Sequence, residues 1–449
     1  MMASLSNPDS QVLEPSPRTS AATYWLWVFG AILAVKGLLF WGDHTPMFFL
    51  GDSVAYLSTA TGDWIPPDRS FFYGWIIRFL AVRTGSLTML LASQTLASAL
   101  TALCGVFILR RYLAVSPAGA ALMGLICAVE PLQLLYERYV MTEAFSLLIF
   151  ALFTTLALGY LKHPSVVRIV LVQLAGVVLI GLRVSFLPEV EAATLLVPVL
   201  GGLGALTGEV SRNRVRLKSA GHSALRWRRL GVHLGLSCVL FFGLHYGYKR
   251  YYAGLIQHEL PHATPAYYYE NGFHLLAFVA PIVQPCDFPN AAKADAIFQN
   301  LAYDLGDPQT RGKQRWVEGG LIAHLKAAYP NPLEANRLAA ATAWNAVKRD
   351  PRGEFLLALT GFADYWNRDH LRAGMIMDRG GDRELPPDLL LLLHQHFNLA
   401  GEGLPHLATV TNRYYFAAWA WYLVLMLWPL PALFVTVVSP RLHRSAVFL

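Results

Sequence analysis

Long apolar stretches constrain this chain more than any other feature of its sequence. They run approximately over Tyr24–Trp41, Leu87–Leu109, Ala118–Val129, Ala144–Leu161, Val166–Leu182, Phe186–Leu206, Leu230–Tyr248 and Tyr415–Val438. A helix that crosses a bilayer needs about 20 mainly apolar residues, and only a helix satisfies its own backbone groups in lipid. Charged residues make up 14% of the chain, against about 25% in an ordinary soluble domain. The sequence predicts an all-α polytopic membrane protein with about eight transmembrane helices.

The basic residues predict how these helices are oriented. They follow the second, fourth, sixth and eighth stretches, as Arg110, Arg111, Lys162, Arg168, Arg212, Arg214, Arg216, Lys218, Arg226, Arg228, Arg229, Arg441 and Arg444. Short cytoplasmic loops collect Lys and Arg, so all four places and both termini are expected in the cytoplasm. This bias explains the net charge of +7, and nucleic acid is not an expected partner. There is no basic n-region before a short apolar region and no small-residue cleavage site, so we expect the first stretch to be a retained helix.

Four parts are expected along the chain. They are a disordered cytoplasmic tail (1–22), a transmembrane core (23–248) with a catalytic first outer loop (43–85), an extracytoplasmic segment (249–413), and a last transmembrane helix with a cytoplasmic tail (414–449). The extracytoplasmic segment is expected to be mainly helical.

One helix of that segment is marked by its sequence. Asp350-Pro351 is typical of a helix start, and Phe355, Leu359, Phe362 and Trp366 then recur at helical spacing. Such an amphipathic helix either packs in the core of its segment or lies at the membrane interface, and we favour core packing.

The first outer loop carries most of the candidate chemistry. Residues 48–79 read FFLGDSVAYLSTATGDWIPPDRSFFYGWIIRF. Asp52 follows a glycine that permits a tight turn, Tyr56 comes one helical turn later, and Arg69 is close enough in sequence to share a phosphate site. Asp52 equally fits a helix cap that accepts from the backbone N–H groups of Val54 or Ala55. Both interpretations stay open from spacing alone.

A second group of candidates lies in the turn EPLQLLYERYVMTEAF, between the third and fourth stretches. It holds Glu137, Arg138 and Glu143, which are expected on the same side of the membrane as Asp52. Thr142-Glu143 also reads as a plain helix start.

Two cations lie close to or within apolar stretches. Arg183 ends the run VVLIGLR, and Lys36 lies inside the first stretch. Each can extend to the membrane boundary as a simple anchor. Each can also bind a phosphate at the level of the lipid head groups.

Metal and cofactor signals are weak. The four cysteines show no disulfide or metal-ligand spacing. His394-Gln-His396 lacks a partner carboxylate at a recognised spacing. There is no Walker loop, GxSxG elbow or HExxH motif. No cofactor is expected, and a divalent metal is a minor alternative.

These residues resemble the GT-C superfamily of integral-membrane glycosyltransferases, which includes protein O-mannosyltransferases and the lipid A aminoarabinose transferase. The likeness is carried over about the first 200 residues by GDSVAYLSTA, DRSFFYGWIIRF, ERYVMTEAF and GLRVSFLP. Ser53 stands where many relatives have a second acid, and Val184 stands where a proline commonly follows the basic residue.

The resemblance implies transfer of a sugar from a polyprenyl-phosphate donor to a lipid, glycan or protein acceptor, with inversion. Asp52 is then the general base, and Glu143 or Glu137 positions the acceptor or stabilises the oxocarbenium-like transition state. The expected substrate-binding residues are Arg69, Arg138, Arg183, Tyr56, Tyr73 and Lys36, with the arginines on the leaving phosphate. The implied place is a bacterial inner or plasma membrane, with the active site on the extracytoplasmic side.

Three other function classes remain. A transporter or flippase for a lipid-linked or anionic substrate is the first alternative, and it predicts two related halves with interrupted helices; no such repeat is found. An assembly protein would use residues 249–413 as its binding module. A membrane acyltransferase would need a histidine within a span, and His233 and His245 lack a convincing partner.

Overall fold

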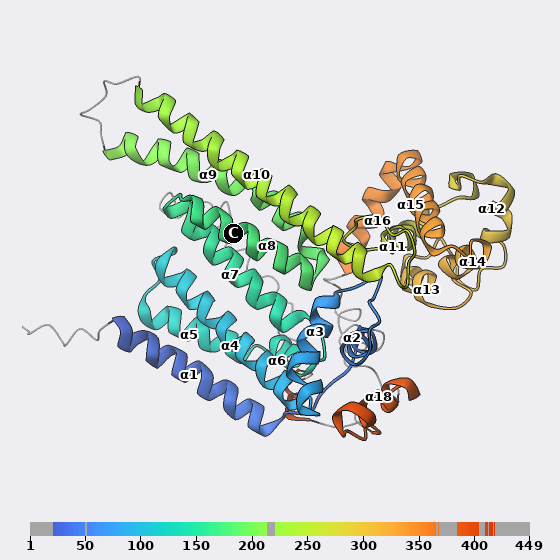
Figure 1. Ribbon diagram of the computed structural model, residues 1–449, viewed down its shortest axis with the longest axis horizontal. Coiled ribbons are helices and arrows are strands. Elements are labelled where there is room, and N and C mark those ends of the chain that lie inside the picture. Colours follow the sequence, from blue (N-terminus) through green and yellow to red (C-terminus); the bar gives the residue numbers. More distant parts are fainter. Residues whose placement is uncertain are drawn as a thin grey trace, which may run out of the picture.

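The computed structural model describes residues 21–49, 52–212, 221–364, 367, 384–403, 409–411, 413–415 and 417. These residues form helices, turns and loops, with one isolated parallel bridge between Met47 and Tyr139. Long helices lie side by side in a bundle, and a group of shorter helices sits at one end of it (Figure 1).

Five helices of the bundle are long and apolar enough to cross a membrane. They are α1 (Ala21–Gly42), α4 (Thr88–Arg111), α7 (Glu143–Lys162), α9 (Leu187–Arg212) and α10 (Gly221–Ile256). A helical membrane protein is therefore confirmed. The eighth expected span lies almost wholly outside the described residues.

Two of the expected spans differ from simple crossings. The third is broken into α5 (Pro117–Ala128) and α6 (Pro131–Arg138), which are bent by 47° and together make a possible sixth span. The residue before a proline avoids the helical region, and Glu130 is extended and caps α6 by accepting from Leu132 N and Gln133 N. The fifth, α8 (Val166–Leu182), has 17 residues because Arg183 is extended.

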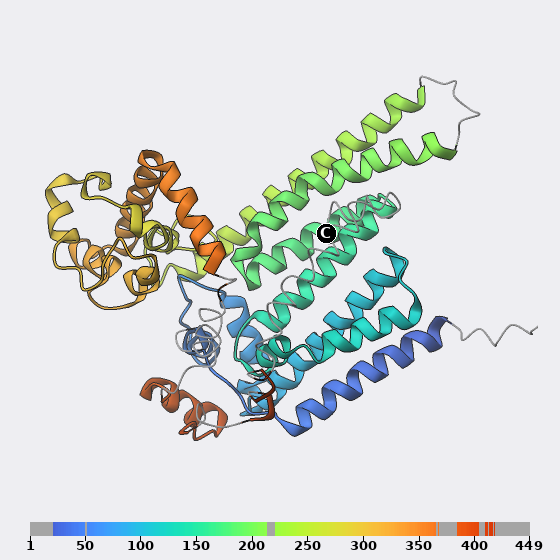
Figure 2. The ribbon, with the colours of Figure 1, turned by 180° about the vertical axis from the view of Figure 1, so that it is seen from behind.

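The first outer loop folds into two short helices at the end of the bundle where α10 meets the shorter helices (Figure 2). These are α2 (Asp52–Thr61) and α3 (Phe71–Leu80), followed by the turn η1 (Val82–Thr84). Arg78 ties them together, because it donates to the carbonyls of Thr59 at 3.0 Å and Ala60 at 2.8 Å. A Cβ on Gly74 would lie 2.5 Å from Thr59 Cβ, so this close crossing requires glycine.

The outer segment is a small helical unit beyond α10. Its elements are α11 (Asn271–Val279), η3 (Ala280–Ile282), η4 (Pro285–Asp287), α12 (Ala291–Phe298), η5 (Pro308–Thr310), α13 (Arg311–Trp316), α14 (Leu321–Ala328), α15 (Pro332–Arg349) and α16 (Pro351–Asp364). Its core includes Phe273 and Leu276 of α11, Leu321 and Leu325 of α14, and Ala339 of α15. This arrangement gives the segment a core separate from that of the membrane helices.

A later helix, α18 (Pro387–Phe397), returns to the first outer loop. Its Leu389 and Leu393 join Leu57 of α2 and Ile77 of α3 in one buried cluster. The first loop is thus packed from both sides by parts of the chain that follow it much later in sequence.

The apolar face of α16 does not lie where the favoured interpretation, core packing, puts it. It begins at Pro351 as expected, with Asp350 Oδ1 accepting from Gly353 N at 2.8 Å. However, Phe355, Leu359 and Phe362 are 67%, 52% and 60% exposed in the described structure, so core packing is wrong for these three. Helical periodicity identifies an apolar face but not what covers it. The fourth residue of the pattern, Trp366, lies outside the described residues.

Candidate active site

A cavity of about 180 Å³, here called the inner cavity, lies between the first outer loop and the ends of α7 and α8. Its charged and phenolic lining includes Asp52, Tyr56, Asp68, Arg69, Glu143 and Arg183. Five of these six were candidates from the sequence, and Asp68 is the addition. The structure therefore brings together two acid–arginine pairs from separate parts of the chain.

The first pair is Asp52 with Arg69. Arg69 Nη1 donates to Asp52 Oδ1 at 2.5 Å, and its Nε donates to Asp68 Oδ1 at 2.8 Å. Arg69 Nη2 also donates to Asp68, so Asp68 holds the guanidinium with both oxygens. The Asp52 side chain is 35% exposed, whereas Arg69 and Asp68 are mostly buried. Asp68 thus holds the Arg69 guanidinium in a position where it also binds Asp52.

The electrostatics of Asp52 follow from this place. Burial raises the pKa of the Asp52 carboxyl, and the neighbouring Arg69 opposes that effect without cancelling it. Burial, with the Asp52 carboxylate next in importance, also raises the pKa of the Tyr56 phenol. Tyr56 therefore stays protonated beside a carboxylate that is more basic than usual.

The start of α2 is held by Ser53 rather than by Asp52. Ser53 Oγ accepts from Phe49 N at 2.9 Å and donates to Val140 O at 3.0 Å. In the contacts of the described residues, the Asp52 carboxylate accepts from Arg69 and not from the N–H groups of α2. The helix-cap interpretation of Asp52 is not borne out.

The second pair is Glu143 with Arg183. Glu143 begins α7, Arg183 ends α8, and Arg183 Nη1 donates to Glu143 Oε1. The other oxygen, Glu143 Oε2, is buried and has no hydrogen-bond partner among the described residues. A buried carboxylate oxygen without a donor is costly. This oxygen is therefore an open acceptor in the lining of the inner cavity.

Ser70 connects the two pairs. As the cap of α3 it accepts from Tyr73 N, and it donates to Gly181 O at 2.6 Å, two residues before Arg183. The loop that carries Arg69 is thus attached directly to the turn that carries Arg183.

Tyr73 lies behind the cavity rather than in its lining. Its ring is fully buried against Tyr56, with ring centres 4.9 Å apart, and its hydroxyl donates to Gln94 Oε1 at 2.5 Å. Gln94 Nε2 donates in turn to Glu137 O and Tyr139 O. Tyr73, which the sequence predicts to bind substrate, is therefore not part of the cavity lining, because its phase on α3 points it into the protein.

Lys36, Glu137 and Arg138 form a separate cluster between α1, α4 and α6. Lys36 Nζ and Arg138 Nη1 both pair with Glu137, and Arg138 Nε donates to Asp43 O at 2.6 Å. The three side chains are at most 1% exposed. The break before α6 turns Glu137 and Arg138 inward. The structure therefore does not place these three expected site residues at the inner cavity.

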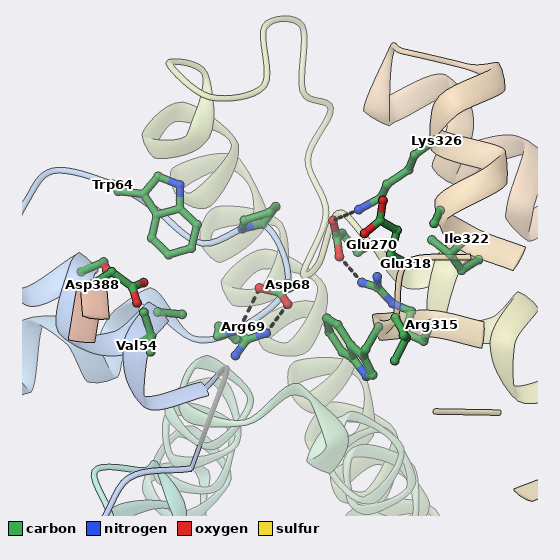
Figure 3. A pocket seen from close by; sticks show the side chains of 16 residues that line it. Val54, Trp64, Asp68, Arg69, Glu270, Arg315, Glu318, Ile322, Lys326 and Asp388 are labelled. Carbon is green, nitrogen blue, oxygen red and sulfur yellow. Dashed lines mark hydrogen bonds and ion pairs between the residues drawn. The ribbon is translucent and has the colours of Figure 1, made fainter. Parts of the chain in front are cut away.

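A larger space, here called the outer cavity, adjoins the inner one and has a volume of about 800 Å³. It lies between α2 with its following loop and the outer segment. Figure 3 shows Asp68 and Arg69 in the middle of its lining, with Trp64 and Asp388 on one side and Glu270, Arg315 and Lys326 on the other. Glu270 pairs with Arg315, and Lys326 Nζ lies 3.4 Å from Glu270 Oε1.

The sequence analysis missed the outer cavity. Its far wall comes from residues that follow Asp68 by about two hundred positions or more, and no local motif marks them. The nearest signal is the run of three tyrosines, 267–269, before Glu270. Two of them, Tyr267 and Tyr268, line the inner cavity.

Metal ligands and relatives were also sought. Within the described residues, no group of three or more His, Cys, Asp or Glu side chains is placed to hold a metal ion. No protein-family model, curated protein or solved structure matches the chain.

Proposed function

We propose that this protein is a membrane glycosyltransferase that moves a sugar from a polyprenyl-phosphate donor to an extracytoplasmic acceptor, with inversion. One observation carries the proposal: the pairs Asp52–Arg69 and Glu143–Arg183 line a single cavity at the end of an apolar helix bundle. The carboxylates are suited to contact the sugar and its acceptor, and the arginines are suited to bind a phosphate. The position at the bundle end suits a donor whose chain lies in lipid.

Each residue has a role in one displacement. The acceptor hydroxyl attacks the anomeric carbon while the bond from that carbon to the phosphate oxygen breaks, and Asp52 takes the hydroxyl proton. Attack opposite the leaving phosphate inverts the anomeric centre. The raised pKa of Asp52 makes it a better base than an exposed carboxylate.

The other residues stabilise the charges that develop on the leaving phosphate and on the sugar ring. The departing polyprenyl phosphate gains negative charge, which Arg69 and Arg183 stabilise. The free oxygen of Glu143 accepts a sugar hydroxyl and faces the positive charge that develops on the ring. The activated donor supplies the driving force, so no nucleotide or other cofactor is needed.

The basic residues of the bundle support an extracytoplasmic site. Lys162 Nζ donates to Arg111 O at 3.1 Å, so the last turns of α7 and α4 meet. Asp52 belongs to the opposite end, near the start of α7 and the end of α8. Because Lys and Arg tend to stay on the cytoplasmic side, this arrangement supports an extracytoplasmic position of the inner cavity. A bacterial inner or plasma membrane fits this arrangement.

A transfer assay in lipid tests the proposal. Wild type, Asp52→Asn and Asp63→Asn would each receive a panel of polyprenyl-phosphate sugars, and free polyprenyl phosphate would be measured. Asp63 is a fully exposed acid of the same loop and is the matched control. Wild type and Asp63→Asn should release the lipid, whereas Asp52→Asn should lose about 100-fold or more of the rate.

The other outcomes are equally informative. Normal release by Asp52→Asn would rule out the base role, and a retained anomeric configuration by NMR would rule out direct displacement. If wild type released nothing from any donor, the transferase proposal would fail. Movement of lipid-linked sugars between leaflets of vesicles would then be the activity to measure.

A further inference from the structure

The outer cavity shares part of its lining with the inner one. Asp68 and Arg69 line both spaces, and Arg69 itself binds Asp52. A molecule seated in the outer cavity therefore lies directly behind the Asp68–Arg69 pair. The outer cavity is about four times as large as the inner one, since their volumes are about 800 and 180 Å³. Ligand pockets have volumes of about 300–1,000 Å³.

The charges of its lining argue against an anionic occupant. Arg69 pairs with Asp68, while Arg315 and Lys326 both pair with Glu270. Within the described lining, the cations are thus each matched to an acid. Glu318 and Asp388 add two carboxylates, which only accept hydrogen bonds. A ligand that supplies hydroxyl groups suits these oxygens better than a phosphate.

One donor of the lining is unused. Arg315 is 5% exposed, and its Nε is buried without a hydrogen-bond partner in the part of the chain that the structure describes. A buried N–H of this kind is unfavourable until an acceptor reaches it. A hydroxyl oxygen can accept from it, while the same hydroxyl groups donate to the carboxylates of Glu318 and Asp388.

Two indole rings complete the site. Trp64 is 39% exposed and Trp316 is 58% exposed, and they come from the first loop and from α13. A tryptophan offers a flat apolar face with a polar edge. A pyranose ring has C–H groups on its faces and hydroxyl groups around its rim, so it matches both the indoles and the polar groups beside them.

We propose that the outer cavity binds the acceptor, and that this acceptor is a neutral carbohydrate. Its rings stack on Trp64 and Trp316, and one hydroxyl is directed past the Asp68–Arg69 pair to Asp52. The role as acceptor rests on the proposed transferase function, whereas the binding of sugar in this cavity does not.

Ligand binding is the test, since it needs no turnover. Full-length protein in lipid nanodiscs would be mixed with the methyl glycosides of glucose, galactose, mannose and N-acetylglucosamine and with their disaccharides. Saturation-transfer NMR would detect binding and compare wild type with Trp64→Ala, Trp316→Ala and Trp344→Ala. Trp344 is an exposed tryptophan of α15 outside the cavity and serves as the matched control.

At least one sugar should bind to wild type and to Trp344→Ala. Its affinity should fall about 2- to 10-fold in each cavity variant, which is the range for loss of one aromatic contact. Trp316 also contacts Arg315 and His274, so Glu318→Gln is a second variant with less effect on packing, and it should weaken the same sugar. No binding by any sugar, or equal binding by all variants, would overturn the proposal. A lysine tripeptide that binds in place of sugars, with the same dependence on the tryptophans, would also overturn it.

The two proposals fail separately. If a sugar binds as expected but no donor releases polyprenyl phosphate, the transferase proposal fails and the carbohydrate site remains. If donors are consumed but no sugar depends on Trp64 or Trp316, the transferase proposal stands and the acceptor is of another class or lies elsewhere.

A separate observation concerns α16. Phe355, Leu356 and Leu359 are all about half exposed or more, although this helix belongs to the outer segment. Its packing against the segment is through η3 and α15 and includes the buried Leu357. Figures 1 and 2 show α16 close to the end of α10 and running across the direction of that span rather than along it. An apolar helix in this orientation at the end of a membrane bundle is placed as an interfacial helix would be.

We also propose that α16 lies in the membrane interface with these three side chains in lipid. A fluorescent label on a cysteine at Leu359 should be quenched by lipids brominated near the head group. A label at Asp295, which is exposed on α12, should not be quenched. Equal quenching at the two positions would overturn the proposal. Coverage of α16 by a water-soluble part of this chain would overturn it too.

Discussion

Arg69 Nη1 lies 2.5 Å from Asp52 Oδ1, although 17 positions separate the two residues in the chain. The same guanidinium is held by both oxygens of Asp68. The proposed base therefore touches a fixed cation that belongs to both cavities. The two largest effects on its pKa, burial and Arg69, oppose each other, and each can be changed separately.

Removal of Arg69 should move the pH dependence of transfer. Burial raises the pKa of Asp52 and Arg69 lowers it, so Arg69→Gln should raise that pKa further. The base must be ionised to act, and the acid side of the profile of kcat/KM should therefore shift to higher pH. The exposed Arg83 gives the control Arg83→Gln. An acid limb at the same pH in both variants would mean that another group titrates.

Removal of Arg183 should weaken use of the donor. A hydrogen bond to a charged group contributes about 1.5–3 kcal/mol, so Arg183→Ala should raise the donor KM about 10- to 100-fold. Arg183→Lys, which keeps the charge, should restore part of this. Initial rates against donor concentration would show the effect. A donor KM equal to that of wild type would leave Arg183 as an anchor at the membrane boundary.

The buried cluster around Glu137 should matter for stability. Lys36→Met removes one partner of a carboxylate that is 0% exposed, and breaking such a pair costs about 3–5 kcal/mol. The melting temperature in lipid should fall, and adding Glu137→Gln should recover part of the loss. The sequence analysis expected Lys36 to bind substrate. If Lys36→Met kept its stability and lost transfer, that expectation would be right after all.

Acid should destabilise the outer segment through His274. Burial, reinforced by Arg315, lowers the pKa of His274 to about 4, whereas a histidine in an unfolded chain titrates near pH 6.5. Between these values the unfolded state binds more protons, so stability falls as the pH drops from about 6.5 to 4. His274→Gln should reduce this fall in melting temperature, whereas His258→Gln, at an exposed position, should not. Equal slopes in both variants would assign the acid sensitivity to other groups.

Local chemistry in the sequence was enough to predict part of the site. The apolar stretches predict helices, and their order predicts that Asp52, Arg69, Glu143 and Arg183 share one end of the bundle. The structure places all four in one cavity. The prediction worked because each lies next to the end of a helix, where the polypeptide has little freedom to move it elsewhere.

The sequence does not distinguish where neighbouring residues with the same chemistry lie in the structure. Glu137 and Glu143 are six positions apart, yet one lies in the Lys36 cluster and the other in the inner cavity. The difference arises at the extended residue Tyr139, because Met47 N donates to Arg138 O before it and Val140 N after it donates to Met47 O. A pairing between residues about 90 positions apart leaves no periodic pattern. The wall that contains Arg315 and Glu270 was hidden for the same reason.

Gln94 has a consequence for how the site meets its substrate. Its amide nitrogen binds the carbonyls of Glu137 and Tyr139, on the chain that leads to Glu143, and its amide oxygen binds Tyr73, which packs on Tyr56 behind Asp52. One side chain thus sets the spacing between the two halves of the inner cavity. The work of bringing the carboxylates and arginines together is done when the chain folds. Little of the binding free energy of a substrate is then consumed in rearranging them, and that energy remains for lowering the barrier.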